Sequence, residues 1–378
     1  MKILILDREW SQTAYLVVSL VRAGFHVVLA SGRSAEPWGL GRYCRMITAP
    51  NGIDDPDFIE QLLRTEQADI VFPAAETLLQ IVWHLPGDLT EKVFPATTPM
   101  QRRLLSHRPA MYEFVSALEV PVPEFVNLPD ERELEVAAQR LTFPCVLRGT
   151  QGLGGDQVRV VNDLTAARTE YSYLKDHSPG TPFAQRFLSG QRCLFGGLFD
   201  SGTMLQWFSQ RTIESNTRTG PSLRVKSLND PLLTEQATRI FSGLQWTGLA
   251  CAEFILTDTG QYHFLEINPR PWAAIQAAHC CGVPLMDLFA KFLLKHSPKR
   301  ALPFVADREV TLFPAFLEAR LATGEGLKLR DMASHMRSLR AVPWRYPGLL
   351  MHFGRKLRWS AQLGLESRRH GGGARVSR

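Results

Sequence analysis

Several familiar patterns are missing from this 378-residue sequence. None of its six cysteines belongs to a CxxC pair, so neither a zinc cluster nor a thioredoxin-like motif is expected. The adjacent Cys280 and Cys281 follow a helical pattern, and packing explains them better than redox chemistry. No apolar run approaches the length of a membrane-spanning helix. The first residues, MKILILD, lack the long apolar region and cleavage site of a signal peptide. We therefore expect a cytoplasmic protein.

The body of the chain also lacks an excess of basic residues. The net charge is +6, but the segment from Arg345 to Arg378 alone carries eight Lys or Arg and one Glu. The other 344 residues carry 35 basic and 36 acidic groups and are close to neutral. The sequence therefore gives no reason to expect nucleic acid as a partner.

The first hundred residues alternate the patterns of strands and helices. Lys2–Leu6, His26–Ala30 and Ile70–Pro73 are expected strands with helical patterns between them. This alternation is typical of a parallel sheet, whose binding sites lie beyond the carboxyl ends of its strands. The residues at those ends are Asp7, Ser31–Ser34 and Glu76; for each, a capping or loop role is as good an interpretation as ligand contact. We expect a Rossmann-like domain over residues 1–105.

A second unit, expected over residues 106–300, contains a hairpin rich in polar side chains. Its strands are expected at Leu249–Leu256 and Gln261–Asn268. A loop of two or four residues would pair Glu253 with Phe264. A loop of three or five residues would break this parity and place Glu253 and Glu266 on opposite faces of the hairpin. With the even loop, side chains alternate so that both glutamates and the final asparagine share one face.

This shared face predicts a metal site. Glu253, Glu266 and Asn268 would present two carboxylates and an amide from rigid strands. Such an all-oxygen set suits Mg²⁺ or Mn²⁺ rather than zinc. The alternative is a solvated face with two unrelated glutamates, which the apolar neighbours of these residues argue against.

Phosphate-binding features surround the hairpin in the sequence. Arg148 ends an expected strand and leads into GTQGLGG, in which backbone N–H groups can approach phosphate oxygens. Neither GxxxxGK[ST] nor GxGxxG after the first strand is present, so P-loop and dinucleotide interpretations are less favoured. Arg108 begins the preceding helix and Arg270 follows the hairpin, and guanidinium groups suit phosphate. Alone, the loop could be a plain mobile turn.

These motifs together resemble those of the ATP-grasp family. The resemblance runs from about Ser106 to Leu294, with residues 1–105 similar to the Rossmann-like domain that commonly precedes it. The closest motif match is to the carbamoyl-phosphate synthase large-subunit branch, here in a single copy. The stretches that carry it are HRPAMYEFVSALEVPVP, FPCVLRGTQGLGG, TGPSLRV and AEFILTDTGQYHFLEINPRPW.

The resemblance implies a role for each candidate residue and an α/β plus α+β fold with two ATP-grasp subdomains. ATP and two Mg²⁺ or Mn²⁺ ions are the implied cofactors. The implied metal ligands are Glu253, Glu266 and Asn268; the implied catalytic groups are Arg270, which faces the transferred phosphate, and Arg148. The implied ATP contacts are Arg108, Arg148, Gly152, Gly154, Gly155 and the connecting strand residues Gln185, Arg186, Phe187 and Leu188, the last four largely through backbone groups.

The resemblance also implies the reaction. A substrate carboxylate attacks the γ-phosphate of ATP, and an amine or another nucleophile then displaces phosphate from the acyl-phosphate. Phosphoryl transfer needs cations and fixed positive charge more than covalent catalysis, which agrees with the residues found. However, Ser189–Cys193 lacks the carboxylate that often contacts ribose. An alternative is therefore a catalytically weak nucleotide-binding regulatory protein or a membrane-associated protein of the same fold.

Residues 301–378 resemble no family and are expected to form a helical region with a basic tail. Leu350, Phe353 and Leu357 have helical spacing beside basic residues, with Trp344 and Trp359 flanking them. Such a helix could contact an anionic membrane weakly. Packing on the body, followed by a disordered end, is the interpretation we favour. The sequence leaves a homodimer open.

Overall fold

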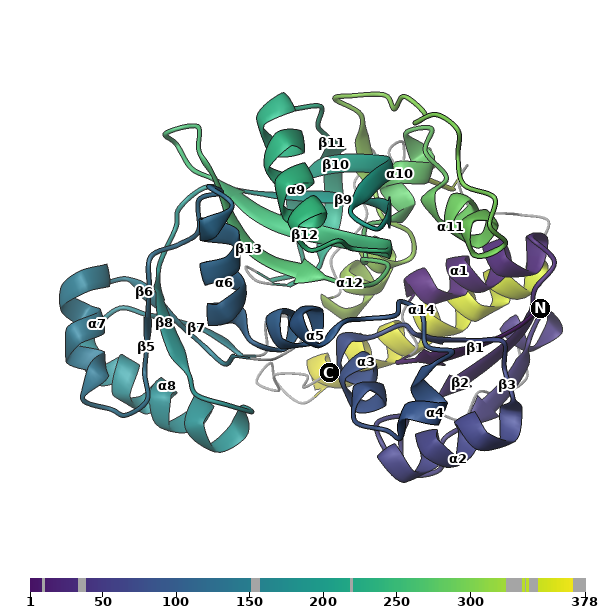
Figure 1. Cartoon of the computed structure of the whole chain (residues 1–378), viewed down its shortest axis with the longest axis horizontal. Helices are drawn as coiled ribbons and strands as arrows, with labels where there is room; N and C mark the ends of the chain where they lie inside the picture. The colour runs from purple at the N-terminus through teal and green to yellow at the C-terminus, as the bar shows by residue number, and fades with distance from the viewer. Residues whose placement is uncertain are drawn as a thin grey trace.

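The computed structural model describes residues 1–8, 11–32, 39–150, 157–217, 220–323, 335–336, 338–339 and 346–369. Within the last range the side chains of residues 356, 359 and 363–369 are excluded. Three β-sheets organise these residues, one in an N-terminal domain and two in the part that follows (Figure 1). The glycine-loop residues Gly152, Gly154 and Gly155 lie outside the described residues, as do Arg33, Ser34, Thr219 and Trp344.

The N-terminal domain is a parallel sheet covered on both faces. Its strand order is β3-β2-β1-β4, and every neighbouring pair is parallel. Leu4 and Leu6 pack with α2 and α3, whereas Ile3 and Ile5 pack with α1 on the other face. The strands are β1 (Lys2–Asp7), β2 (His26–Ser31), β3 (Arg45–Thr48) and β4 (Ile70–Pro73), and the helices are α1 (Ser11–Arg22), η1 (Leu40–Arg42), α2 (Pro56–Glu66), α3 (Glu76–Trp83), α4 (Gly87–Thr90) and α5 (Pro99–Ser106).

A small antiparallel sheet follows, set apart from the rest of the molecule (Figure 1). Its strand order is β5-β8-β6-β7, and helices α7 and α8 cover it through a separate apolar cluster. The elements are β5 (Phe125–Asn127), α7 (Glu133–Leu141), β6 (Cys145–Arg148), β7 (Val158–Val161), α8 (Leu164–His177) and β8 (Phe183–Arg186). Strand β6 ends at Arg148, directly before the glycine loop.

The largest sheet has six antiparallel strands in the order β13-β12-β9-β10-β11-β14. One face packs with α6 and α9, and the other packs toward α10 and α11. The strands are β9 (Gln191–Asp200), β10 (Thr203–Ser215), β11 (Ser222–Ser227), β12 (Gly248–Leu256), β13 (Tyr262–Asn268) and β14 (Glu309–Thr311), and the helices are α6 (Arg108–Ala117), α9 (Pro231–Gly243), α10 (Gln276–Cys280) and α11 (Leu285–Leu293).

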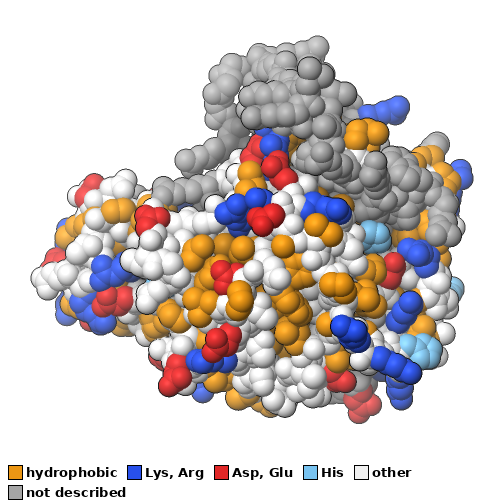
Figure 2. Space-filling view, turned by 90° about the horizontal axis from the view of Figure 1, so that it is seen from above, with side chains coloured by type: hydrophobic (Ala, Val, Ile, Leu, Met, Phe, Trp, Pro, Cys, Tyr) orange, Lys and Arg blue, Asp and Glu red, His pale blue; other side chains and the backbone are white. Residues whose placement is uncertain are grey.

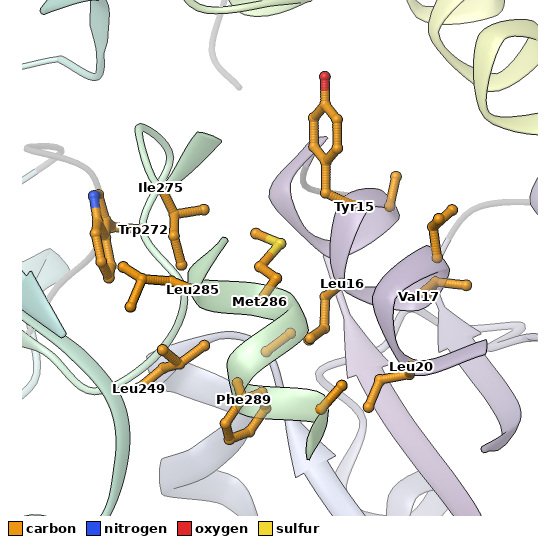
Figure 3. Packing of buried hydrophobic residues seen from close by; sticks show 14 of the residues in the cluster. Tyr15, Leu16, Val17, Leu20, Leu249, Trp272, Ile275, Leu285, Met286 and Phe289 are labelled. Atoms are coloured by element: carbon orange, nitrogen blue, oxygen red, sulfur yellow. The ribbon is translucent and has the colours of Figure 1, made fainter. Parts of the chain in front are cut away.

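The N-terminal domain is joined to the large sheet by a continuous hydrophobic core. Leu16 and Leu20 of α1 face Met286 and Phe289 of α11, with Trp272 at the sheet side of the cluster (Figure 3). Full burial of such side chains is worth about 1.5–3 kcal/mol each. This packing holds the carboxyl ends of the N-terminal strands at a fixed place relative to the hairpin.

The C-terminal region is not purely helical. Strand β14 pairs with β11 and so extends the large sheet beyond residue 300. Helices α12 (Ala315–Thr323) and α14 (Pro347–Arg369) follow, and α14 lies along α1 (Figure 1). Leu349 and Phe353 are completely buried, and the Phe353 ring contacts Tyr15. The described part of this helix therefore packs on the body, the interpretation we favoured. The domain boundaries at 105 and 300 stay predictions.

Two further observations concern the described helices and the surface of the molecule. No described helix has the length and apolarity needed to cross a membrane. On the face shown in Figure 2, hydrophobic side chains gather centrally, with charged side chains of both signs around them.

Candidate functional site

The hairpin of β12 and β13 carries the candidate metal ligands in a register that differs from the predicted one. Glu253 pairs directly with Glu266 rather than with Phe264, so the predicted pairing was wrong. Five residues separate the two strands, and this spacing alone would place Glu253 and Glu266 on opposite faces of the hairpin. A β-bulge at this point of the hairpin leaves Leu265 as an extra residue, and it thereby brings Glu253 opposite Glu266. The prediction of a shared face is thus fulfilled by a different arrangement.

The bulge separates a core face from a polar face. Phe254 and Phe264 pair with each other and are fully buried on the core face. Glu253 and Glu266 are direct cross-strand partners, so their side chains leave the hairpin on the same side. Burial and the neighbouring Glu266 raise the pKa of Glu253. Two carboxylates this close repel each other, and a bound cation would relieve that repulsion.

Two arginines neutralise Glu266 in this structure. Arg148 Nη2 lies 2.6 Å from Glu266 Oε2 and Arg108 Nη2 lies 3.4 Å from the same oxygen. Burial alone would raise the pKa of Glu266, but Arg108 and Arg148 overcome this and lower it. Burial and the nearby Arg148 in turn lower the pKa of Arg108. Paired guanidinium groups that repel each other form a site suited to an anion with several oxygens.

A second chain of contacts links the hairpin to the N-terminal domain. Asn268 donates from Nδ2 to Glu253 Oε1 at 3.3 Å and accepts from Arg270 Nη2 at 2.8 Å. The same Nη2 lies 3.5 Å from Oε1 of Glu76, the first residue of α3. Burial raises the pKa of Glu76 to about 7, although the charge of Arg270 opposes this. The N-terminal domain therefore contributes a carboxyl group to the site.

The connecting strand β8 holds the remaining candidate residues. Tyr112 Oη donates to Gln185 Oε1 at 2.9 Å, and Arg186 is paired with Glu124 at 2.6 Å. Both side chains therefore already have partners within the protein, and the expected backbone contact with adenine stays a prediction. Phe187 and Leu188 follow β8, half-buried, in the short link between the two sheets.

Sequence reasoning missed several polar residues on the floor of the site. Gln210 of β10 lies in the same row across the sheet as Glu253, with Leu194 of β9 between them. It is 1 % exposed, and neither side-chain amide atom has a hydrogen-bond partner among the residues that the structure describes. Arg192 donates to the hydroxyl oxygens of Thr212 and Ser222. Such positions cannot be found before the register of β9, β10 and β12 is known.

The residues present fit a divalent cation. Within the described part of the chain, no three His, Cys, Asp or Glu side chains come together as a metal cluster. Glu253 and Glu266 therefore need a third oxygen, and Asn268, 6 % exposed and beside Glu253, supplies one. Two carboxylates and an amide are ligands that Mg²⁺ and Mn²⁺ accept.

Comparison with known sequences shows that part of this chain resembles a known family. Residues 106–274 match the model of the ATP-grasp domain family. Among curated proteins, pyruvate carboxylase from Aspergillus niger is 26 % identical over 202 residues, which cover 50 % of this chain and 16 % of that protein. Acetyl-CoA carboxylase 2 from Oryza sativa subsp. japonica is 27 % identical over 212 residues, 46 % of this chain and 9 % of that protein. The chain thus spans a small part of these relatives.

Solved structures share the fold. The biotin carboxylase domain of Hydrogenobacter thermophilus 2-oxoglutarate carboxylase, in complex with MgADP, ADP and bicarbonate, has a TM-score of 0.69 at 15 % identity, covering 81 % of this chain and 72 % of that one. N5-carboxyaminoimidazole synthetase from Staphylococcus aureus, complexed with ADP, has a TM-score of 0.66 at 17 % identity, covering 80 % and 79 %. L-amino acid ligase from Bacillus licheniformis has a TM-score of 0.62 at 16 % identity, covering 78 % and 74 %. The ATP-grasp prediction is confirmed; the narrower likeness to carbamoyl-phosphate synthase stays a prediction.

Proposed function

We propose that this chain, whose residues 106–274 form an ATP-grasp domain, is an ATP-dependent ligase that joins a carboxylate to an amine or another nucleophile. The observation that carries the proposal is the cross-strand pair of Glu253 and Glu266 beside three guanidinium groups. Phosphoryl transfer depends on such fixed charge and on positioning. The names of the similar proteins, which include carboxylases and an amino acid ligase, support the same class.

In the proposed reaction, an oxygen of the substrate carboxylate attacks the γ-phosphorus of ATP. The bond from that phosphorus to the bridging oxygen breaks, so ADP leaves and an acyl-phosphate forms. The nucleophile then attacks the acyl carbon, inorganic phosphate leaves, and an amine loses one proton. Arg148 and Arg108 are placed to bind phosphate oxygens, and Arg270 is placed to face the transferred group.

Glu253, Glu266 and Asn268 would hold Mg²⁺ or Mn²⁺, which supplies charge neutralisation for the phosphates when it is bound. The chain's own residues contribute orientation: Arg270 is held by Asn268 and Glu76 before any ligand arrives. Gly152, Gly154 and Gly155 are proposed to cover the phosphates. A cytoplasmic location and a homodimer stay predictions.

The test is ADP release from ATP and Mg²⁺ in the presence of pooled carboxylates and amines. Wild-type protein should release ADP only when a productive pair is present. Glu266→Gln should reduce this release at least 100-fold with an unchanged circular dichroism spectrum, because it removes a metal-binding charge between two arginines. Glu235→Gln, on the exposed face of α9, is the matched control and should keep full activity. Near-normal release by folded Glu266→Gln would contradict the metal assignment.

A further inference from the structure

The connection from α11 to β14 carries an apolar run on the surface of the molecule. The run is residues 301–306, with the sequence ALPFVA, and all six residues are exposed except the half-buried Phe304. Leu302 is 42 % exposed and Val305 is 47 % exposed. The connection lies along the upper edge of Figure 1, the side that Figure 2 faces. Single exposed apolar residues are ordinary, but a contiguous exposed stretch commonly marks an interaction site.

The backbone of the apolar run is held in place by buried polar groups. Gln206, which is completely buried, accepts from Leu302 N at 2.6 Å and donates to Leu302 O at 3.0 Å. Val305 N donates to Cys281 O at 3.0 Å, and Val305 O accepts from Ser227 Oγ at 2.7 Å. A surface that is fixed before binding loses little conformational entropy when a partner docks.

Phe304 anchors the middle of the run on the large sheet. Its ring lies edge-on to Trp207, with 4.9 Å between the ring centroids, and 5.1 Å from the ring of Phe208. Leu302 and Val305, on either side of this anchor, remain exposed. The run therefore presents two aliphatic side chains to solvent from a rigid base.

Charges of opposite sign flank the apolar run. The exposed Lys299 and Arg300 precede it, and the exposed Asp307 follows it. Among the residues that the structure describes, neither Lys299 nor Arg300 forms an ion pair with a carboxylate. Asp307 contacts Lys226 at 2.9 Å, but its side chain is 79 % exposed and keeps room for a second cation. The surface is thus basic at one end and acidic at the other.

We propose that this surface pairs with the same surface of a second copy of the chain, about a two-fold axis at the midpoint of the run. A two-fold axis sets identical surfaces against each other in opposite directions. Leu302 then lies against the partner's Val305, and Arg300 lies against the partner's Asp307. Both pairs have the same midpoint in the sequence, so one axis satisfies the apolar and the charged contacts together, and symmetry repeats each of them.

The symmetry of the pattern favours a second copy over an unrelated protein. An unrelated partner would require exposed apolar groups, but it would not require Leu302 and Val305 to share a midpoint with Arg300 and Asp307. In the pair of copies, the apolar contact supplies the affinity. The ion pairs at its rim chiefly fix the register, because exposed ion pairs add little affinity and like charges placed together repel.

Sedimentation velocity of the full chain over a micromolar dilution series tests the proposal. Wild-type protein should dimerise reversibly. Leu302→Glu should weaken the dimer about tenfold or more, because two carboxylates per dimer enter an apolar contact. Val136→Glu makes the same kind of change at a 43 % exposed position on α7 and should leave the dimer unchanged. A monomeric wild type would overturn the proposal, as would a dimer that survives Leu302→Glu.

A charge exchange tests the register. Arg300→Asp and Asp307→Arg should each weaken self-association, because like charges then meet twice in every dimer. When the two variants are mixed, opposite charges meet at both places, so a mixed dimer should form at close to wild-type affinity. Native mass spectrometry separates this mixed dimer from the two homodimers by mass, and circular dichroism checks that both variants are folded. Folded variants that stay apart when mixed would overturn the two-fold pairing. Neither measurement depends on ligase activity.

Discussion

Arg148 is the residue whose role follows most directly from its contacts. It ends β6, is 6 % exposed and lies 2.6 Å from Glu266. A buried guanidinium is retained where an anion needs a planar pair of donors. Arg148 compensates Glu266 in this structure, and we propose that it binds a phosphate oxygen when a metal ion takes its place beside Glu266.

We predict that Arg148→Ala weakens ATP binding about 10- to 100-fold, the loss expected for one or two hydrogen bonds to a charged group. Arg148→Lys should keep part of the affinity, since a point charge replaces some of the guanidinium contacts. Isothermal titration calorimetry with Mg²⁺ present measures both. Arg140→Ala, an exposed change on α7, is the control. Wild-type affinity in the alanine variant would make Arg148 a structural residue only.

Glu76 gives a second prediction, in the pH dependence of stability. Its pKa is raised by burial to about 7 in the folded protein, above the ordinary value of a glutamate. The folded state therefore binds more protons than the unfolded state between about pH 4.5 and 7, so this group's contribution to stability falls as pH rises through that range. The charged groups that face Glu76 are unchanged in the Glu76→Gln variant with which wild type is compared below. They are Arg270, Arg108, Glu253 and Glu266.

Urea denaturation of wild type and Glu76→Gln, without metal or nucleotide, tests this sign. Between pH 5.5 and pH 8, wild type should lose about 1–2 kcal/mol of unfolding free energy relative to the variant. A pH-independent difference between the two proteins would show that Glu76 titrates normally.

At the scale of the element, the hairpin shows how far sequence reasoning reaches. Both strands and the shared face were predicted, because alternation and hydrophobicity mark them. The pairing of Glu253 with Glu266 was not, since no residue signals the bulge that offsets the five-residue loop.

Other parts of the site depend on contacts between elements distant in sequence. Glu76 was placed at the end of a strand by the pattern alone, but its contact with Arg270 depends on how α1 packs against α11. Gln210 carried no motif at all. The glutamates and arginines were predictable because phosphate and metal chemistry restricts residue type, whereas the floor and the domain contact are set by tertiary packing.

The close packing around Gly196 of strand β9 leads to a prediction about stability. A Cβ placed on Gly196 would collide with the ring of Trp272. Gly196→Ala should therefore lower the free energy of unfolding by about 1–3 kcal/mol, the usual cost of overpacking. Gly87→Ala, where the new atom meets open space, should change it little. Chemical denaturation of both variants measures the difference; equal stabilities would mean that Trp272 moves aside freely.

At the scale of the whole molecule, we predict that the C-terminal helix contributes to stability rather than to chemistry. The candidate phosphate and metal groups all precede residue 271, and α14 contacts α1, α12 and η1 instead. The helix fits so closely that Gly348 donates its backbone N–H to Tyr43 Oη at 2.9 Å. The described basic residues Arg355 and Arg358 thus lie on the exposed side of a helix that an apolar face anchors on the N-terminal domain.

Phe353→Ala should consequently lower the free energy of unfolding by about 3–5 kcal/mol, as for other buried phenylalanines. The ATP dissociation constant of the folded variant should equal that of wild type. Met351→Ala, on the exposed side of the same helix, should leave stability within about 0.5 kcal/mol. Weaker ATP binding by folded Phe353→Ala would show that α14 supports the site as well as the domain.

The pairing of Glu266 with Arg108 and Arg148 has a thermodynamic consequence if the chain is the proposed ligase. A metal ion that arrives alone must displace both guanidinium groups and leave them without an anion. A nucleotide that arrives alone draws the same groups away and leaves Glu266 uncompensated. When the two arrive together, every charge finds a new partner at once. Each ligand then raises the affinity for the other by an equal factor, so the site selects the metal–nucleotide complex over its separate components.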